Sequence, residues 1–394
     1  MKKLAVVATH PVQYHASIWR RLAAEGGLGI HVFYGSDFSV AGYTDSGFGV
    51  TVKWDVPLTE GYEHTFLRRG GTWDDRPLTR MRPHGLEERL RAFAPHALLL
   101  TGYGIPFHRE TFLIARRLAL PVIVRSEAND ETADRSFPKR FFRDLLIRAV
   151  YRRCAYFLAI GERARAHYER HGVSPHLIGF SPYTTDSDRV EGQYNALAPR
   201  RSSIRSALGF SEEDTVFLFA GKLIPRKDPM TLAHALCGLP DNLRHSTGLI
   251  VMGDGPLRSE LESLCRTALG ERAVFAGFVN QNGIGEFYTA ADCLVLPSLA
   301  ETWGLVVNEA LQFGVPAIVS SRVGCAPDLV IPGKTGFTFP AGRVAGLRQR
   351  LEDAWALLRN AREETREACR RKAAEYSVER AVAGICEAVD RVVR

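Results

Sequence analysis

The chain has 394 residues, of which 45% are hydrophobic and 24% are charged. This balance is typical of a folded, water-soluble protein, and the length favours two domains over one. No stretch approaches the roughly 18 apolar residues of a membrane span, and the apolar run LAVVA near the N-terminus is too short for a secretory signal, so we expect a cytoplasmic protein.

The charge is uneven along the chain. Residues 1–190 hold 27 Lys+Arg against 20 Asp+Glu, and the remainder holds 24 against 24, which together give the net +7. A basic first half favours an anionic partner, either lipid headgroups or phosphate-bearing acceptors, whereas the absence of a recognised module argues against nucleic acid. The seven cysteines are scattered singly, which predicts reduced thiols rather than disulfides or a zinc site.

Short apolar runs alternate with helix-length segments, first over residues 3–160 and again over 215–321. The first series is KLAVVAT, IHVFYG, HALLLTG, PVIVRSE and AYFLAIG, and the second is TVFLFAG, GLIVMGDG, AVFAGFV, CLVLPS and PAIVSS. Continuous apolar strands of this kind predict parallel sheets covered on both faces. We therefore predict an α/β fold with two doubly wound, Rossmann-like domains, residues 1–195 and 196–376, with ligands at the carboxyl ends of the strands in an interdomain cleft.

Polar residues follow three strands of the first series. The stretch HPVQYH enters the first helix, TGYG follows the third strand, and RSEAND follows the fourth. The side chains we assign to the cleft or to acceptor binding are His10, Gln13, Tyr14, His15, Tyr103, Arg125 and Glu127. The alternatives are a turn shaped by His10, a helical His15 with satisfied hydrogen bonds, and an ordinary surface ion pair between Arg125 and Glu127.

Helix 138–153 has a cationic face and an apolar stripe. The apolar stripe consists of Phe141, Phe142, Leu145, Leu146, Ala149 and Val150, and the cationic face of Lys139, Arg140, Arg143, Arg148, Arg152 and Arg153. Such a helix could rest on anionic lipid as a peripheral membrane contact, or it could bury its apolar stripe in the core. The acidic TTDSD at 184–188 lies in the polar linker, and we expect no metal there.

In the second half, glycines and lysines follow the strands. Gly221, Lys222 and Lys227 follow the first strand, and Gly253, Asp254 and Gly255 follow the second. Glycines permit close backbone approach to a ligand, and two lysines can neutralise a diphosphate without a metal. A solvated turn is the alternative for the lysine pair.

The stretch ETWGLVVNE predicts a loop carrying Glu301 and a helix from about Gly304 to Phe313 that carries Glu309. The first amides of this helix, at Gly304 and Leu305, could bind a diphosphate, and carboxylates suit sugar hydroxyls. The alternative is a capping Glu301 and a solvated Glu309. Further on, residues 347–376 read as one long helix, and Ser377 is the expected N-cap of a terminal helix over 377–394.

The ordered set GKLIPRKD, GDGP, GFV and ETWGLVVNEALQFGVPAIVS, followed by GCAPDLVIPGKTGF, resembles the donor-binding half of the family 4 glycosyltransferases. The resemblance covers about residues 150–394 and is weaker before them. It implies a retaining enzyme of the GT-B fold that uses a nucleoside-diphosphate sugar, with no metal and no other cofactor, and whose terminal helix crosses back to the N-terminal domain.

The resemblance also implies roles for single residues. Glu309 is similar to the ribose-binding glutamate and Glu301 to the residue that holds the donor sugar. Lys227 matches the diphosphate-binding lysine, and Lys222 stands where an arginine is more usual. Gly304 and Leu305 would meet the diphosphate, and Phe278 and Val279 would border the base. We expect Glu301, Lys222 and Lys227 to be the catalytic set.

The implied reaction moves a sugar to an acceptor hydroxyl on a glycan or lipid-linked acceptor, in cell-surface polysaccharide or glycolipid assembly. Two alternatives are a catalytically inert partner that binds sugar nucleotides and a nucleotide-sugar epimerase on the same fold.

Overall fold

The computed structural model describes residues 1–45, 47, 50–69, 80–130 and 137–393. The chain divides into two compact units, which are described separately. Unit 1 comprises Met1–Thr44, Thr51–Asp186 and Ser377–Arg394, and unit 2 comprises Asp45–Val50 and Ser187–Tyr376. Among the described residues, no helix combines the length and apolar character needed to cross a membrane.

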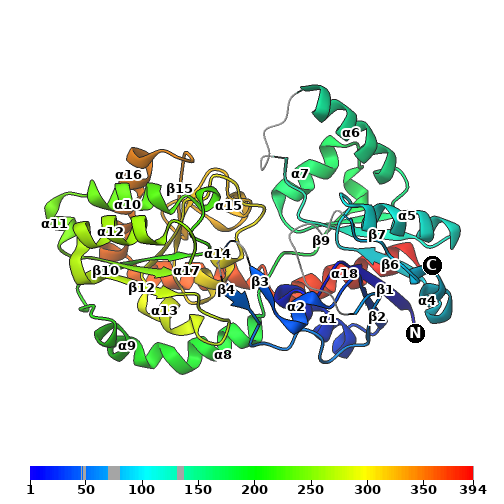
Figure 1. Ribbon diagram of the computed structural model, residues 1–394, viewed down its shortest axis with the longest axis horizontal. Coiled ribbons are helices and arrows are strands. Elements are labelled where there is room, and N and C mark those ends of the chain that lie inside the picture. The colour runs from blue at the N-terminus through cyan, green and yellow to red at the C-terminus, as the bar shows by residue number, and fades with distance from the viewer. Residues whose placement is uncertain (46, 48–49, 70–79, 131–136, 394) are drawn as a thin grey trace. The chain divides into compact units, whose positions relative to one another are not determined.

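Unit 1 contains a seven-stranded sheet in the order β5-β2-β1-β6-β7-β8-β9, and neighbouring strands run parallel (Figure 1). Its strands are β1 (Lys3–Ala8), β2 (Gly29–Tyr34), β5 (His64–Phe66), β6 (Ala97–Leu100), β7 (Val122–Arg125), β8 (Tyr156–Ala159) and β9 (Ile178–Phe180). Its helices are α1 (Gln13–Glu25), α2 (Phe38–Ala41), α4 (Leu86–Phe93), α5 (Pro106–Arg117), α6 (Phe137–Tyr151), α7 (Glu162–Arg170) and α18 (Val378–Val392).

Unit 2 contains a six-stranded parallel sheet in the order β12-β11-β10-β13-β14-β15. Its strands are β10 (Thr215–Ala220), β11 (Thr247–Met252), β12 (Ala273–Gly277), β13 (Cys293–Leu296), β14 (Ala317–Ser320) and β15 (Gly336–Phe339). Its α-helices are α8 (Ser187–Leu197), α9 (Arg201–Ala207), α10 (Pro229–Cys237), α11 (Asp241–Arg244), α12 (Arg258–Leu269), α13 (Ile284–Ala290), α14 (Leu305–Gln312), α15 (Ala326–Leu329), α16 (Val344–Asn360) and α17 (Arg362–Ala374). The short strands β3 (Tyr43–Asp45) and β4 (Val50–Val52) form a separate two-stranded sheet.

The apolar runs form the strands because both faces of each sheet are covered. All six residues of β10 are buried, and so are all four of β13 and all four of β14. A strand buried on both faces gains no stability from alternating polar residues, which explains the continuous apolar sequence. The predicted fold class, two doubly wound parallel sheets, is confirmed.

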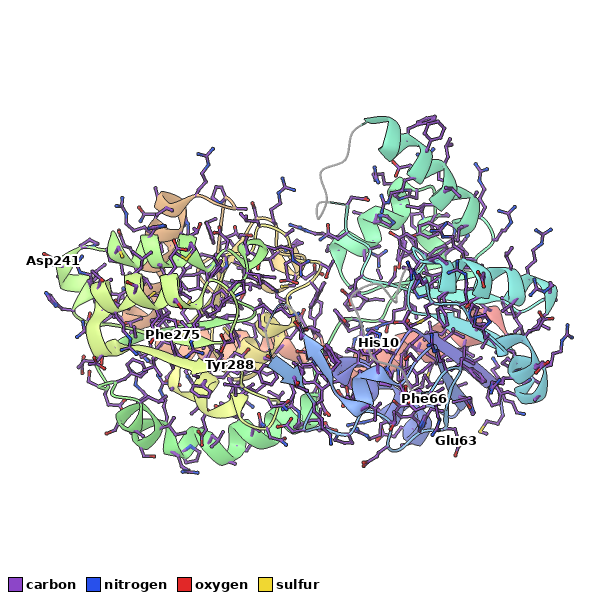
Figure 2. The ribbon with its side chains drawn as sticks, in the orientation of Figure 1. His10, Glu63, Phe66, Asp241, Phe275 and Tyr288 are labelled. Atoms are coloured by element: carbon purple, nitrogen blue, oxygen red, sulfur yellow. The ribbon has the colours of Figure 1, made fainter. Side chains whose placement is uncertain are left out.

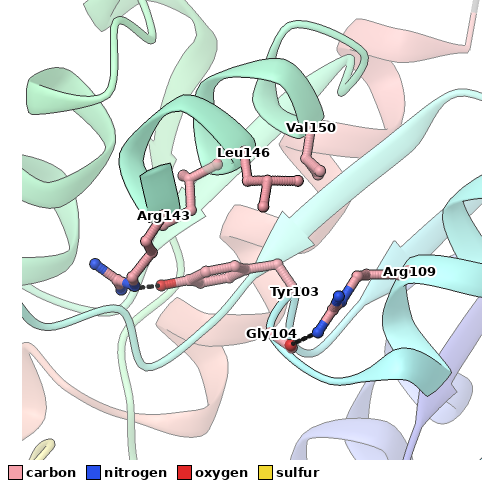
Figure 3. A pocket seen from close by; sticks show the side chains of 7 residues that line it. Tyr103, Gly104, Arg109, Arg143, Leu146 and Val150 are labelled. Carbon is pink, nitrogen blue, oxygen red and sulfur yellow. Dashed lines mark hydrogen bonds between the residues drawn. The ribbon is translucent and has the colours of Figure 1, made fainter. Parts of the chain in front are cut away.

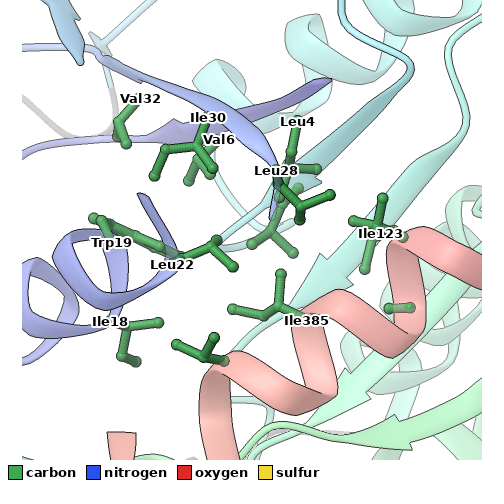
Figure 4. Packing of buried hydrophobic residues seen from close by; sticks show 14 of the residues in the cluster. Leu4, Val6, Ile18, Trp19, Leu22, Leu28, Ile30, Val32, Ile123 and Ile385 are labelled. Atoms are coloured by element: carbon green, nitrogen blue, oxygen red, sulfur yellow. The ribbon is translucent and has the colours of Figure 1, made fainter. Parts of the chain in front are cut away.

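The terminal helix α18 completes the core of unit 1. Ile385 is fully buried together with Trp19 and Leu22 of α1 and with residues of β1 (Figure 4). The hydroxyl of Ser377 accepts a hydrogen bond from the amide of Arg380, as expected for the N-cap. The last helix of the chain is thus part of unit 1, although the 190 residues before it belong to unit 2.

Two boundaries differ from the sequence-based expectation. The predicted domain boundary at 195/196 falls inside α8, which packs against α13 and α14, so the structure divides the chain at Asp186/Ser187. The single helix predicted over 347–376 is two helices, because Ala361 leaves the helical conformation (φ −145°, ψ 40°). This break allows α17 to pack against α14.

Helix α6 does not bury the apolar stripe predicted for it. Phe141, Phe142, Leu145 and Leu146 are 53%, 66%, 48% and 61% exposed, whereas Ile147 and Tyr151 are buried. The core-packing alternative is therefore wrong for these four side chains. The side chains of Lys139 and Arg140 lie outside the described residues.

A buried ion cluster holds three elements of unit 2 together. Asp292, just before β13, accepts hydrogen bonds from Arg201 (2.7 Å), Arg205 (2.9 Å) and Arg362, and from the amide of Val216 (2.9 Å). Burial alone would raise the pKa of Asp292, but the three guanidinium groups outweigh it and hold this pKa below its ordinary value. The cluster thus connects α9, β13 and α17.

We expect Asp292→Asn to destabilise the protein by about 3–5 kcal/mol, because it leaves buried guanidinium charge uncompensated. A carboxylate whose pKa is lower in the folded than in the unfolded state stabilises the fold at pH values above its unfolded pKa. The destabilisation caused by Asp292→Asn should therefore be complete at neutral pH and should decrease only below about pH 4. Urea unfolding at neutral pH and below about pH 4 measures the change in the free energy of unfolding. Asp241→Asn, at an exposed pair, is the control and should change stability by less than about 0.5 kcal/mol. Equal effects of the two variants would contradict the role of the cluster.

Candidate functional site

The residues assigned to donor binding gather at one edge of the unit 2 sheet. They follow the carboxyl ends of four adjacent strands, β12, β11, β10 and β13. Because these strands are parallel, their carboxyl ends lie at the same edge. The residues brought to this edge are Gly221, Lys222, Lys227, Gly253, Asp254, Gly255, Phe278, Val279, Glu301, Gly304, Leu305 and Glu309.

The loops after β10 and β11 are joined backbone to backbone. The amide of Gly221 donates to the carbonyl of Met252 (2.9 Å), and that of Leu223 donates to the carbonyl of Asp254 (2.8 Å). A Cβ on Gly253 would lie 1.8 Å from the carbonyl oxygen of Gly221, so a glycine is required at position 253 for these two loops to contact each other. Gly221 differs, because a Cβ there would meet only distant atoms of Lys227 and Phe219, at 3.9 Å or more. Of these two glycines, Gly221 is the one that leaves room for a ligand.

Glu309 is buried, with 3% of its surface exposed, so the alternative of a solvated residue is wrong. Its carboxylate accepts a hydrogen bond from the hydroxyl of Tyr288 on α13, at 2.8 Å. Tyr288 is labelled in Figure 2. Tyr288 in turn stacks on Phe313, with ring centroids 5.4 Å apart. These contacts fix the carboxylate within the first turns of α14. The sequence gives no sign of Tyr288, because it lies 21 positions before Glu309 in another element.

Glu301 pairs with Lys227 rather than capping α14. The ammonium group of Lys227 donates to the Glu301 carboxylate, and both side chains are largely buried. The backbone of Glu301 is fixed as well, since its amide donates to Arg322 (3.3 Å) and its carbonyl accepts from Gly324 (3.0 Å). Two residues assigned to different parts of a donor, sugar and diphosphate, are therefore direct neighbours.

Lys222 also has a carboxylate partner. Its ammonium group lies 2.7 Å from both carboxylate oxygens of Asp45, a residue that clusters with unit 2. The amide of Gly47 donates to the same carboxylate at 2.9 Å. The solvated-turn alternative is thus wrong for both lysines. Asp45 was missed in the sequence because it lies far from Lys222 along the chain.

Five other assigned residues lie in the loops at this edge and at the start of α14. Asp254 accepts from the amide of Gly255 (2.8 Å) and from Arg258 (2.6 Å), which ties the loop to α12. Phe278 and Val279 are partly buried directly after β12. Leu305 begins α14, where Gly304 precedes it with φ +102°. A helix N-terminus therefore lies between Glu301 and Glu309.

In unit 1, three polar side chains gather around Tyr183. Its hydroxyl donates to Glu127 at 2.5 Å, its ring lies 5.7 Å from that of His15, and the Arg125 guanidinium lies 5.7 Å from the same ring. Arg125 is buried and donates to Ser181 and Pro182, so it is not the surface ion pair of the alternative. The sequence did not indicate Tyr183, because it lies in the segment taken as a linker.

The histidines of HPVQYH are neutral. Burial lowers the pKa of His10 to about 4, and burial with the charge of Arg125 lowers the pKa of His15 to about 3. His10 is hydrogen-bonded to the hydroxyl of Thr9 (2.9 Å) and packs on Phe38. Gln13 and Tyr14 begin α1. At neutral pH this stretch offers uncharged hydrogen-bonding groups, suited to sugar hydroxyls more than to a phosphate.

Tyr103 lines a separate pocket of about 400 Å³ in unit 1 (Figure 3). The other lining residues are Gly104 and Arg109 at the start of α5, and Arg143, Leu146, Ile147 and Val150 of α6. Arg143 donates to the hydroxyl of Tyr103 (3.4 Å), and Arg109 donates to the carbonyl of Gly104 (3.1 Å). The pocket combines two guanidinium groups with an apolar wall.

One group of described residues has the donor atoms for a metal, namely Asp130, His167 and His171. Arg170 donates to Asp130 (2.9 Å) and Asp144 (3.3 Å), and so supplies positive charge to the same carboxylates. We interpret the group as a polar network that fastens α6 to α7. The group does not include the acidic residues of TTDSD, of which Asp186 lies 3.7 Å from Arg20.

Comparison with known proteins shows that the second half of the chain is similar to a family. Residues 200–376 match the family model described as "Glycosyl transferases group 1". An uncharacterized glycosyltransferase of Methanocaldococcus jannaschii is 32% identical over 155 residues, which are 36% of this chain and 39% of that protein. The sulfoquinovosyl transferase SQD2 of Arabidopsis thaliana is 34% identical over 149 residues, 37% of this chain and 28% of that protein. The chain thus spans less than two fifths of the length of these relatives.

Solved structures match over the whole chain. The sucrose-phosphate synthase of Thermosynechococcus elongatus superposes with a TM-score of 0.70 at 18% identity, covering 100% of this chain and 99% of that one. The Anabaena protein HepE in complex with UDP superposes with a TM-score of 0.71 at 16% identity, covering 99% and 100%. At this identity the match supports the fold.

We expect Gly304→Ala to destabilise the protein by about 1–3 kcal/mol, because its φ of +102° is unfavourable for alanine. The new Cβ would also lie 3.0 Å from Leu296 and 3.1 Å from Val323, which are both fully buried. Thermal and urea unfolding measure the change. The control is Gly192→Ala in α8, where a Cβ meets nothing within 4 Å and should stabilise by up to about 1 kcal/mol. A Gly304→Ala variant as stable as the wild type would contradict a strained turn before α14.

Proposed function

We propose that this chain, whose residues 200–376 match the family model for glycosyl transferases group 1, transfers a sugar from a nucleoside-diphosphate donor to an acceptor hydroxyl. The single observation that carries the proposal is the pair of carboxylates at the start of α14. There, a buried carboxylate held by Tyr288 and a second carboxylate paired with Lys227 lie on either side of a helix N-terminus. Such an arrangement suits a ligand with hydroxyl groups at both ends and a diphosphate between them.

Each group would contact a different part of the donor. Glu309 would accept hydrogen bonds from the ribose, and Phe278 and Val279 would border the base. Lys222, Lys227 and the amides at Gly304 and Leu305 would stabilise the diphosphate as it leaves, and Glu301 would orient the sugar. Uridine nucleotides are the first donors to test, since HepE was solved in complex with UDP and with UDP-glucose.

The pairing of both lysines with carboxylates fits this role. Asp45 and Glu301 provide the negative charge next to the lysines that a diphosphate would provide in the complex. An arriving diphosphate would exchange for at least one carboxylate contact, so no metal is needed for charge balance. We propose a retaining transfer in which the leaving phosphate oxygen accepts the proton of the acceptor hydroxyl, with no metal or other cofactor in the reaction.

We further propose that unit 1 supplies the acceptor-binding groups. The neutral His10 and His15, with Gln13, Tyr14 and the Tyr183–Glu127 pair, offer donors and acceptors for a sugar. Acceptors from cell-surface polysaccharide or glycolipid assembly are the classes to examine first. Helix 138–153 would give the protein peripheral contact with the inner face of a membrane, with the body of the protein in the cytoplasm.

The decisive experiment is incubation of the purified full-length chain with a panel of nucleoside-diphosphate sugars, without acceptor and then with glycan and lipid-linked acceptors. Transfer predicts slow release of free sugar and nucleoside diphosphate without acceptor, and faster release with the right one. Conversion of the donor into an isomeric sugar nucleotide would instead identify an epimerase. Donor binding with no turnover under any condition would identify an inert binding partner.

We expect Glu309→Gln to weaken binding of the nucleoside diphosphate by about 2–4 kcal/mol, because hydrogen bonds from the ribose to a charged acceptor are lost. Isothermal titration calorimetry measures the change. Glu286→Gln on the exposed side of α13 is the matched control and should bind like the wild type. An unchanged affinity of Glu309→Gln for the nucleoside diphosphate would show that Glu309 does not contact the donor. The transfer activity of the chain is tested separately, by the incubation described above.

A further inference from the structure

Among the described residues, unit 1 has an exposed apolar surface. It consists of Phe141, Phe142, Leu145 and Leu146 on α6, and of Leu113 on α5, which is 56% exposed. Single exposed apolar residues are common, but five large ones on two helices that share a pocket wall are typical of an interaction surface.

The same helices carry positive charge without counter-charge. Among the described residues, five arginines of α5, α6 and the turn after α6 lie within ion-pair distance of no carboxylate: Arg109, Arg116, Arg148, Arg152 and Arg153. Of the acids near these helices that the structure describes, Glu110 pairs with Arg82 (2.7 Å), and Asp130 and Asp144 pair with Arg170. The partner of this surface is therefore expected to be anionic.

The pocket joins these two features. Arg143 is balanced by Asp130 and Asp144, each 3.6 Å away. Arg109 is therefore the cation of the pocket that no described carboxylate balances. The hydroxyl of Tyr103 and the guanidinium of Arg109 can both donate to a phosphate oxygen, and Leu146 and Val150 form an apolar wall beside them (Figure 3). A ligand that satisfies both halves of the pocket carries a phosphate and a hydrocarbon portion.

We propose that this pocket binds the phosphate of an anionic membrane lipid, with the apolar face of α6 placed among the acyl chains. The unpaired arginines around it would contact neighbouring headgroups. The proposal rests on the peripheral membrane contact proposed above for helix 138–153 and names its ligand. Because lipid binding in unit 1 requires none of the donor residues of unit 2, its failure would leave the proposed sugar transfer standing.

The test is cosedimentation of the full-length chain with vesicles of phosphatidylcholine, with and without phosphatidylglycerol. The wild type should bind the anionic vesicles and release them at high salt. Arg109→Gln should weaken this binding about fivefold, as expected for one basic residue at the surface. The control Arg371→Gln removes an exposed arginine from α17 of unit 2 and should bind like the wild type.

The apolar contribution is tested with the double variant Phe142→Ser/Leu146→Ser, which should weaken vesicle binding at least about tenfold. Ile331→Ser, at a residue of unit 2 that is 38% exposed, is the matched control. Because the replaced side chains are exposed, both variants should keep the circular dichroism and melting temperature of the wild type.

Three results would overturn the proposal. The first is equal binding of the wild type to neutral and anionic vesicles, or to neither. The second is glycerol phosphate competing as well as a short-chain phosphatidylglycerol, which would indicate a site for a free phosphate. The third is a wild-type dimer by light scattering that Phe142→Ser/Leu146→Ser converts to a monomer without loss of vesicle binding, which would make the apolar surface an interface between two copies.

Discussion

The parallel pairing of neighbouring strands is the constraint on which the candidate site depends. In unit 2 it brings the ends of β12, β11, β10 and β13 to one edge, although the residues that follow them are spread over positions 221–309. A parallel sheet also requires a crossover after each strand, so every strand end is followed by a loop that can carry chemistry. Gly253 shows how tightly these loops pack, since a Cβ there would overlap the backbone of Gly221.

The charges at this edge are arranged as exchangeable pairs. Lys222 and Lys227 each contact a carboxylate, Asp45 and Glu301, and in all four side chains less than a third of the surface is exposed. A lysine left alone at this burial would lose hydration without compensation. A carboxylate neighbour stabilises the ammonium charge and can give way to a phosphate. Asp292 is different, because three arginines and a backbone amide surround it, and nothing in that cluster is arranged for exchange.

The sequence predicted the parts of the protein that depend on local pattern. Ten of the thirteen strands in the two large sheets, the helix carrying Glu309, the N-cap at Ser377 and the fold class follow from apolar runs, glycines and capping residues, whereas β5, β9 and β15 were not predicted. Contacts between distant segments were not predictable in this way. Tyr288 beneath Glu309, Asp45 beside Lys222 and Tyr183 over Arg125 each pair residues from different elements, and no periodicity indicates such pairs. The apolar stripe on α6 shows a second limit of prediction from sequence. An amphipathic pattern is the same for a helix that packs on a core and for one that faces a partner.

The position of α18 has a consequence for how the chain is made. Gly384 lies so close to β9 that a Cβ there would be 1.9 Å from the carbonyl oxygen of Phe180, and Ile385 fills the centre of the unit 1 core. During synthesis these residues leave the ribosome after the whole of unit 2. Unit 2 is nearly continuous in sequence and can fold first, whereas unit 1 keeps an open apolar face until α18 has been synthesised. The synthesis of unit 1 therefore begins before that of unit 2, but its core is completed afterwards. During this interval its open apolar face is the part of the protein most in need of a chaperone.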